Sequence, residues 1–469
     1  MRQTAKACGG SCLAIIIVHQ TTMTDQLNHT DLTERASRLV EAARRAGAGA
    51  ADAVCVRGIS LSVDVRLGKL EETRRAEGDD FTLRAFVGKR SAAVSANVLA
   101  DPAELAERAV AMARAAPEDP FTGLADAEKL AQTLPDLDLI DPTVPSAVEL
   151  TEAALAAEDA SRAVKHVTNS GGASASWRLG GLVLATSHGF SGAYSASRFG
   201  LSASAIAGTG TEMERDYEME GRIHQADLPD PAEIGRKAGE RAVKRLGPRQ
   251  MATGKGVVVY DPRVSTGLIG HLAGAANGAA IARGTSFLRD SLGTAVFLSD
   301  ICVSDDPLRR RGLASHPFDG EGIAAEPLDL VKDGVLATWI LDSASARELG
   351  LVTNGRAARG GSGTRPGTTN LTLAPGTISP ADLIAEADSG LYVTELIGHG
   401  ANIMTGDYSR GAAGYAIENG ALTHPVSEIT IAGNLLDMFK QMKPADDLVY
   451  RSSVNAPTVA VDGLTIAGR

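Results

Sequence analysis

The chain has 469 residues, of which 44% are hydrophobic and 22% are charged, and its formal net charge is −11. This length accommodates two or three domains, and the acidic balance disfavours a nucleic-acid-binding surface, which is normally basic. No apolar run approaches the roughly 18 residues of a membrane-spanning helix, so no membrane partner is expected.

The chain begins with residues 1–24, which we expect to form a disordered leader. The apolar stretch Leu13 to Val18 is shorter than the hydrophobic region of a usual signal peptide, and no clean cleavage site follows it. Met23 is a plausible start, so residues 1–22 are expected to be dispensable. The default location is therefore the cytoplasm.

The four cysteines do not indicate a disulfide framework. Cys8 and Cys12 lie in the leader, where a metal or redox pair is the alternative to two unpaired cysteines. Cys55 and Cys302 lie inside apolar runs and are predicted to be small buried hydrophobic residues.

Helix and strand patterns alternate through the first half. Residues 31–46 have the apolar spacing of an amphipathic helix. Every second residue from Ile59 to Leu67 is apolar, which is typical of a strand with one buried face, and the pattern recurs from Phe81 to Val87. Asp101 and Pro102 predict the start of a helix, because aspartate caps helix N-termini and proline suits the first turn.

The chain then divides into segments. Residues 25–120 are expected to form an N-terminal α+β module. Residues 121–248 are expected to complete that half, because Gly247-Pro248 is a strong stop signal after a helix at 232–246. Residues 249–469 are expected to form a mixed C-terminal domain. The predicted fold class is therefore α+β, with two halves of mixed or antiparallel sheets flanked by helices.

Two hairpin signals and one glycine-rich loop mark the second half. Asp333-Gly334 and Asn419-Gly420 lie between strand-like runs, and these dipeptides favour tight hairpin turns. Residues 354–367, NGRAARGGSGTRPG, carry five glycines and three arginines without a phosphate-binding motif. We interpret this loop as a flexible lid or a partner contact, and a phosphate cradle is the alternative.

Residues 264–286, VSTGLIGHLAGAANGAAIARGTS, form a helix candidate dominated by small residues. Small side chains let another backbone approach closely, so the segment is expected to be buried. A larger side chain at Gly274 is therefore expected to overfill a close contact. His271 is the single histidine of this segment, and we interpret it as a packing or hydrogen-bonding residue.

The usual hydrolase motifs are missing from the sequence. It contains neither G-x-S-x-G nor a paired-histidine HExxH motif, so no catalytic residue and no metal ligand is assigned. A scattered metal site made of His271, His399 and Asp407 is a weak alternative that the spacing does not support.

The polar stretch GHGANIMTGDYSRG contains His399, Asp407, Tyr408 and Arg410. Glycines on both sides would let a ligand come close. One interpretation is a cleft wall that binds a peptide, in which Arg410 contacts a carboxylate and Tyr408 packs against a side chain. The other is a turn shaped by pairing of Asp407 with Arg410.

Several longer motifs together resemble the TldD/PmbA family of bacterial modulator and peptidase proteins. They lie at 117–126 (PEDPFTGLAD), 283–293 (RGTSFLRDSLG), 312–323 (GLASHPFDGEGI), 405–420 (TGDYSRGAAGYAIENG) and 424–435 (HPVSEITIAGNL). The resemblance covers nearly the whole chain from about Asp31. It also favours the peptide-cleft interpretation of Arg410 and its neighbours.

The resemblance implies which branch of the family the chain is close to. In the TldD branch, the helix that corresponds to residues 264–286 carries HExxxH. A cysteine near the C-terminus completes the zinc site there. Those helix positions fall here at about Ile269, Gly270 and Gly274, and the final run VNAPTVAVDGLTIAG has no cysteine. The chain therefore resembles the PmbA branch, also called TldE, which lacks the metal ligands.

By that resemblance, this chain would be the non-catalytic subunit of a zinc peptidase that processes or degrades small or unfolded peptides. The partner would be a TldD-like subunit that binds the zinc, with no cofactor in this chain, and a homodimer is also possible. The alternatives are a self-sufficient metallopeptidase with displaced ligands, or a non-enzymatic modulator of a toxin or of DNA gyrase.

Overall fold

The computed structural model describes residues 29–97, 100–360 and 363–468. The expected leader, residues 1–24, lies outside the described residues, together with Cys8, Cys12 and Met23. The described chain forms antiparallel and mixed sheets with helices beside them, which confirms the α+β fold class. None of the described helices has the length and apolar character needed to cross a membrane.

The first half is built on one antiparallel sheet of six strands, in the order β3-β2-β1-β4-β5-β6. The strands are β1 (Ala50–Arg66), β2 (Lys69–Val87), β3 (Arg90–Asn97), β4 (Val167–Thr186), β5 (Ser191–Ala207) and β6 (Glu214–Arg222). The alternating run from Ile59 lies in β1, where its apolar residues up to Val65 are buried. The predicted segments 25–120 and 121–248 each contribute three strands to this single sheet.

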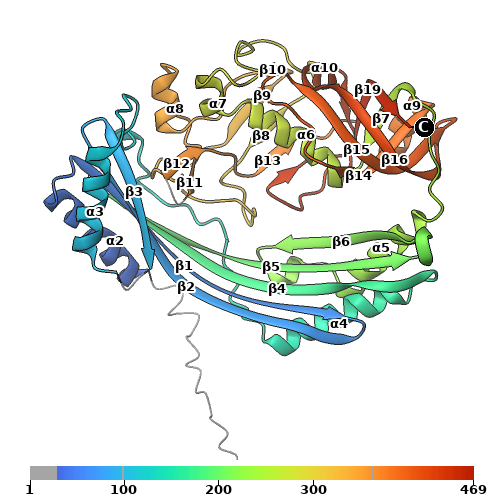
Figure 1. Cartoon of the computed structure of the whole chain (residues 1–469), viewed down its shortest axis with the longest axis horizontal. Helices are drawn as coiled ribbons and strands as arrows, with labels where there is room; N and C mark the ends of the chain where they lie inside the picture. Colours follow the sequence, from blue (N-terminus) through green and yellow to red (C-terminus); the bar gives the residue numbers. More distant parts are fainter. Residues whose placement is uncertain (1–28, 98–99, 361–362, 469) are drawn as a thin grey trace, which may run out of the picture.

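Four helices cover one face of this sheet. They are α2 (Thr30–Arg45), α3 (Pro102–Ala115), α4 (Ala147–Arg162) and α5 (Pro231–Lys244). The predicted start of α3 is confirmed, because the side chain of Asp101 accepts a hydrogen bond from the Ala103 amide at 3.0 Å. Figure 1 shows the sheet as a long curved layer, with the second half of the chain on the side opposite α4.

The second half contains a sheet that closes into a ring. The sheet order is β16-β15-β14-β7-β19-β17, and β19 also pairs with β16. The strands are β7 (Gly254–Tyr260), β14 (Gly390–Ile397), β15 (Asp407–Glu418), β16 (Ala421–Asn434), β17 (Met442–Pro444) and β19 (Val459–Ala467). The pairing of β14 with β7 is parallel and the others are antiparallel, so the sheet is mixed.

A smaller sheet with the order β10-β9-β8-β13-β18 packs in the same half. Its strands are β8 (Val303–Asp305), β9 (Leu328–Lys332), β10 (Val335–Leu336), β13 (Leu371–Leu373) and β18 (Val454–Asn455). The remaining helices of this half are α6 (Pro262–Ala275), α7 (Gly278–Ala282), α8 (Ser343–Glu348), α9 (Pro380–Ala387) and α10 (Leu435–Lys440).

Both hairpin predictions are confirmed. Asp333-Gly334 joins β9 to β10 and Asn419-Gly420 joins β15 to β16. All four residues have positive φ angles, between 50° and 78°, as a tight primed turn requires. Of the two cysteines in the described chain, Cys55 is buried as expected, whereas Cys302 is only partly buried.

The glycine-rich segment 354–367 is not the flexible lid that its composition suggests. Its described part forms a hairpin of β11 (Ala357–Gly360) and β12 (Gly363–Pro366). Arg356 is buried against Asp305, and Arg359 reaches across to Asp52 of β1 at 2.8 Å. The hairpin is therefore an ionic connection between the two halves.

Asp52 is the centre of that connection, because Arg84 of β2 also pairs with it. Burial by itself would raise the pKa of Asp52, but the positive charges of Arg359 and Arg84 lower it to about 2. The carboxylate thus stays charged inside the protein and holds one arginine from each half.

Candidate functional site

The site is organised around α6, which starts immediately after β7. The side chain of Asp261 accepts a hydrogen bond from the Arg263 amide at 3.0 Å, and Pro262 occupies the first turn. Leu268, Ile269 and Leu272 bury one side of the helix in the core of the second half.

The single helix expected over 264–286 is wrong in its length. The helix stops at Ala275 and a short second helix, α7, follows from Gly278. Asn277 causes the break, because its side chain caps α7 at the Ala279 amide and donates to the carbonyl of Pro366. The chain therefore turns where the small-residue pattern alone would continue.

The expected close packing at Gly274 is also wrong. A Cβ atom at Gly267 or Gly270 would meet no atom within 4 Å, and one at Gly274 would meet only the Ile403 side chain at 3.7 Å. Gly270 and Gly274 are exposed. One side of α6 is thus an open surface of glycines.

This open surface does not offer the donor set of a zinc site. Of the three positions that correspond to HExxxH, Ile269 is fully buried and the other two are Gly270 and Gly274. Across residues 29–97, 100–360 and 363–468, no three histidine, cysteine, aspartate or glutamate side chains are grouped so that they could hold a metal ion. His271, His399 and Asp407 accordingly do not form such a group.

His271 of α6 packs against Tyr408 of β15. Its imidazole lies edge-on to the ring of Tyr408, with 6.0 Å between the centroids. In the part of the chain that the structure describes, its buried Nε2 has no hydrogen-bond partner. Burial lowers the pKa of His271, and the positive charge of Arg410 lowers it further, so the ring favours the neutral form.

The four residues predicted to bind a peptide do not face one way. His399 and Asp407 are exposed, and the Asp407 carboxylate accepts a hydrogen bond from Thr405 at 2.7 Å. Tyr408 is 2% exposed and belongs to the core. It differs from Asp407 because adjacent residues of a strand point to opposite faces of the sheet. Arg410 lines a cavity.

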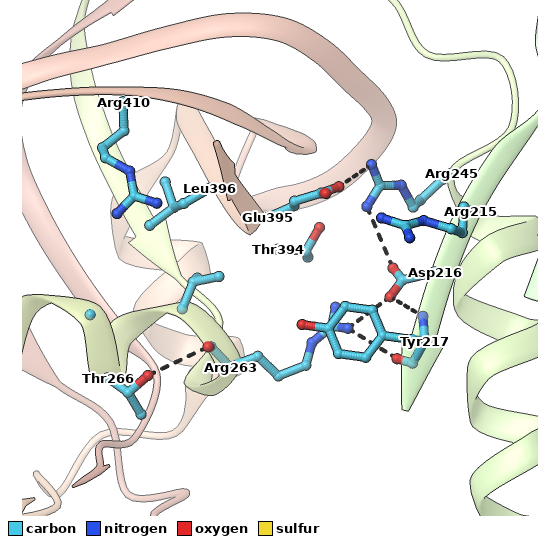
Figure 2. Close-up of a pocket in the computed structure, with 12 residues that line it drawn as sticks. Arg215, Asp216, Tyr217, Arg245, Arg263, Thr266, Thr394, Glu395, Leu396 and Arg410 are labelled. Carbon is cyan, nitrogen blue, oxygen red and sulfur yellow. Dashed lines mark hydrogen bonds and ion pairs between the residues drawn. The ribbon is translucent and has the colours of Figure 1, made fainter. Parts of the chain in front are cut away.

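That cavity has a volume of about 310 Å³ and lies where β6 of the first sheet meets α6, β14 and β15 of the second half. Four arginines line it: Arg215, Arg245, Arg263 and Arg410. Figure 2 shows Arg410 beside Leu396, on the opposite side of the cavity from Asp216.

Two of the four arginines are neutralised by carboxylates. Arg263 pairs with Asp216 at 2.8 Å, and Arg245 pairs with Glu395 at 2.6 Å. These pairs connect β6 and the residue that follows α5 in the first half with α6 and β14 of the second half, so they also fix the walls of the cavity. Arg215 and Arg410 have no carboxylate at ion-pair distance among the described residues.

A larger cavity of about 750 Å³ continues beside the small one. Tyr217, Arg263 and Thr266 line both cavities, and the guanidinium of Arg263 lies 5.8 Å from the centre of the Tyr217 ring. Met219 and Val449, which are 61% and 50% exposed, line the larger cavity. Five arginines also line the larger cavity, namely Arg178, Arg198, Arg241, Arg263 and Arg451. The Arg263–Tyr217 pair therefore forms a partition between two chambers that both contain arginines, of which the larger also offers apolar side chains.

Sequence reasoning singled out Arg410, which lines the small cavity, but not Arg215, Arg245 or the Arg263–Tyr217 pair; that Arg410 binds a peptide stays a prediction. The one available signal was the run ERDYEMEGR in β6, where acidic residues alternate with Tyr217 and Met219. Its partners come from residues 245 and 263, which no local pattern connects to it.

The chain matches three consecutive models of one protein family. They are the PmbA/TldA metallopeptidase domain 1 over residues 51–113, the central domain over 138–246 and the C-terminal domain over 253–468. Among curated proteins, it is 38% identical to the metalloprotease PmbA of Escherichia coli O157:H7, over 93% of this chain and 96% of the relative. It is 36% identical to the PmbA homologue of Haemophilus influenzae, over 93% and 96%.

Solved structures share the fold. A crystal structure from Bacteroides thetaiotaomicron superposes with a TM-score of 0.87 at 27% identity, covering 94% of this chain and 100% of the other. TldE from Thermococcus kodakarensis superposes with a TM-score of 0.82 at 19% identity, covering 92% and 99%. The second likeness concerns the fold alone.

Proposed function

This chain belongs to the PmbA/TldD metallopeptidase family, and on that premise we propose that it is the PmbA/TldE-type subunit of a two-protein zinc peptidase. In this proposal a TldD-like partner binds the zinc and activates the water. This chain contributes part of the enclosure that receives an unfolded or small peptide. The extent of the match to PmbA, which covers nearly both full chains, supports the assignment.

The open glycine face of α6 is the observation that carries the proposal. A catalytic zinc ion needs three protein ligands, an open position and a nearby base. Gly270 and Gly274 supply no donor atom, and Ile269 points into the core. The residues present therefore do not fit a zinc ion at this helix, and no chemical step is assigned to this chain.

The cavity between the halves supports the second part of the proposal. It lies next to α6, and its walls are fixed by ion pairs, so a peptide would meet a preformed surface rather than one that must order on binding. Arg410 is the residue of this chain that we place in contact with the peptide.

The proposal is tested by reconstitution with a homologue that carries HExxxH. Each protein is purified separately, and zinc content, mass by light scattering and cleavage of an unfolded, fluorescence-quenched peptide are measured alone and after mixing. We expect a heterodimer, with zinc in the partner and cleavage only in the mixture. Tightly held zinc at about one per chain in this protein, or full activity of the partner alone, would refute it.

Two matched substitutions show which subunit performs the chemistry. Replacing the glutamate of HExxxH in the partner by glutamine should abolish cleavage by the mixture, because that residue is the expected base. His271→Asn in this chain should leave cleavage within a few-fold, because its ring packs against Tyr408. Complete loss of activity in a folded, partner-bound His271→Asn variant would instead place this chain in the chemical step.

A further inference from the structure

Arg410 is a cation without a counterion inside a built cavity. Its Nε lies 3.5 Å from the carbonyl oxygen of Ile397, and no carboxylate of the described chain lies at ion-pair distance from its guanidinium. The titratable groups that respond to its charge are His271, Tyr260 and Tyr408, none of which supplies a negative charge at neutral pH. A guanidinium forms paired hydrogen bonds to a planar carboxylate, so this position is suited to an anionic group that arrives with a ligand.

The two chambers set the shape of that ligand. The small chamber, at about 310 Å³, is at the lower end of the size of small-molecule sites, so it accommodates an end group rather than a long segment. The larger chamber, at about 750 Å³, offers Met219 and Val449 to apolar side chains. Because both chambers share Tyr217 and Arg263, one ligand could occupy them together.

We infer that this double cavity binds the C-terminal end of a peptide, with the terminal carboxylate at Arg410 and the preceding apolar side chains beyond the Tyr217–Arg263 partition. Arg215 faces the same small chamber and adds a second positive charge near the carboxylate. Arg245 and Arg263 are already paired, so their role is to hold the walls. The peptide nature of the ligand rests on the proposed function; the recognition of a carboxylate rests on the cavity.

The test measures binding to the purified full-length chain by fluorescence anisotropy. The probe is a fluorescein-labelled Ala-Gly-Leu-Ala peptide with a free C-terminus, compared with the same peptide as its C-terminal amide. A third peptide, Ala-Glu-Leu-Ala amide, carries its carboxylate on a side chain instead. We expect the amide to bind at least about tenfold more weakly than the free acid, since one lost charge-assisted contact has that order of effect.

Arg410→Gln completes a double-mutant cycle with the two C-termini. We expect it to weaken binding of the free acid about tenfold and to leave binding of the amide unchanged, so that most of the difference between the two affinities is lost. Arg289→Gln is the matched control, because Arg289 is exposed, pairs with its neighbour Asp290 and lies outside both cavities. It should preserve the full difference between acid and amide.

A second pair of variants tests the cavity without removing a charge. Gly267→Leu should fill the small chamber and abolish the preference for the free acid, because Gly267 lines it and a Cβ there meets no atom within 4 Å. Gly270→Leu adds the same side chain to an equally open position outside both cavities, and it should leave binding unchanged. Both variants should fold, because leucine favours a helix more than glycine does.

Three results would overturn the inference. They are equal affinity for acid and amide, equal weakening of both by Arg410→Gln, and binding of the internal glutamate peptide as tight as that of the free acid. The outcome is separable from the proposed function. A reconstituted peptidase that treats acid and amide alike would refute this inference alone, whereas acid-selective binding without a heterodimer would refute the subunit proposal alone.

Discussion

Glycines on two helices of this protein have opposite environments. In α5, a Cβ at Gly235 would lie 1.8 Å from the carbonyl oxygen of Ala157, because α4 and α5 touch there through their backbones. In α6, a Cβ at Gly270 would meet nothing within 4 Å. The same residue type thus allows close helix packing in one place and leaves an open surface in the other. A glycine-rich helix is therefore evidence of neither packing nor a site until its neighbours are known.

The largest expected effect is from Gly235→Ala. The added methyl group would overlap the α4 backbone, which cannot rotate away as a side chain can, so we expect a loss of about 3 kcal/mol in the free energy of unfolding. Urea denaturation followed by circular dichroism measures it. The control is Arg236→Ala on the exposed side of α5, which should cost only a few tenths of a kcal/mol. A loss below about 0.5 kcal/mol for Gly235→Ala would show that the two helices are not in close contact.

A smaller loss is expected for Gly278→Ala, which sharpens the comparison within the segment 264–286. A Cβ there would lie 2.8 Å from the carbonyl oxygen of Ile340 and 2.6 Å from a methyl group of Leu341. The methyl group can move aside, so we expect about 1 to 2 kcal/mol. The same denaturation experiment measures the change. If this substitution is as well tolerated as one at Gly270, then α7 is not held closely against its neighbours.

Gly270→Ala is expected to change stability in the other direction. The added methyl group enters open space, and alanine loses less conformational freedom than glycine when a helix forms, so the gain should be about 0.5 to 1 kcal/mol. Gly274→Ala should behave similarly, because its one neighbour is at an ordinary contact distance. A destabilised Gly270→Ala protein would mean that this side of α6 is covered in the isolated chain.

The smallest effect concerns His271, the polar residue beside that open side. Burial is the main cause of its lowered pKa and Arg410 is the second, so Arg410→Gln should move the pKa part of the way back towards 6.5. Titration of the imidazole signal by NMR measures this shift, and Arg289→Gln should leave it unchanged.

The sign of the linked stability effect follows from the lowered pKa. The folded protein binds this proton less readily than the unfolded chain, whose histidines titrate near 6.5. The contribution of neutral His271 to the free energy of unfolding is therefore fully present above pH 6.5. It is lost as the pH falls towards the pKa of His271 in the folded protein. If the pKa of His271 is the same in the Arg410→Gln variant as in the unsubstituted protein, then Arg410 lies too far away to act on the imidazole.

Local patterns predicted the local parts of this structure. The strand alternation from Ile59, the cap at Asp101 and the turns at Asp333-Gly334 and Asn419-Gly420 are all determined by residues within a few positions of each other. The α+β class follows from such elements. These features depend on short-range sterics and hydrogen bonds, which the amino-acid order states directly.

The predictions that were wrong or missing concern features that depend on neighbours distant in the sequence. The end of α6 is set by the bond from Asn277 to Pro366, and the open side of α6 by what does not pack against it. The small cavity joins Arg215 with Arg410, which are 195 positions apart in the sequence. Arg410 was singled out because glycines and charges gather around it in the sequence. Its cavity could not be predicted, since a third of the lining residues come from β6 and from Arg245 at the end of α5.

The closure of the second half by β19 has a consequence for how the protein is made. The six strands of the first sheet are complete by residue 222 and α5 by residue 244, so that half can fold while the ribosome is still synthesising the rest. The second half cannot complete its sheet until the end of synthesis. The last strand, β19, pairs with both β7, which is the first strand of this half, and β16. Until residues 459–467 have emerged, β7 and β16 each have an unpaired edge. Chaperone binding during translation should therefore concentrate on nascent chains between about residue 260 and the arrival of β19.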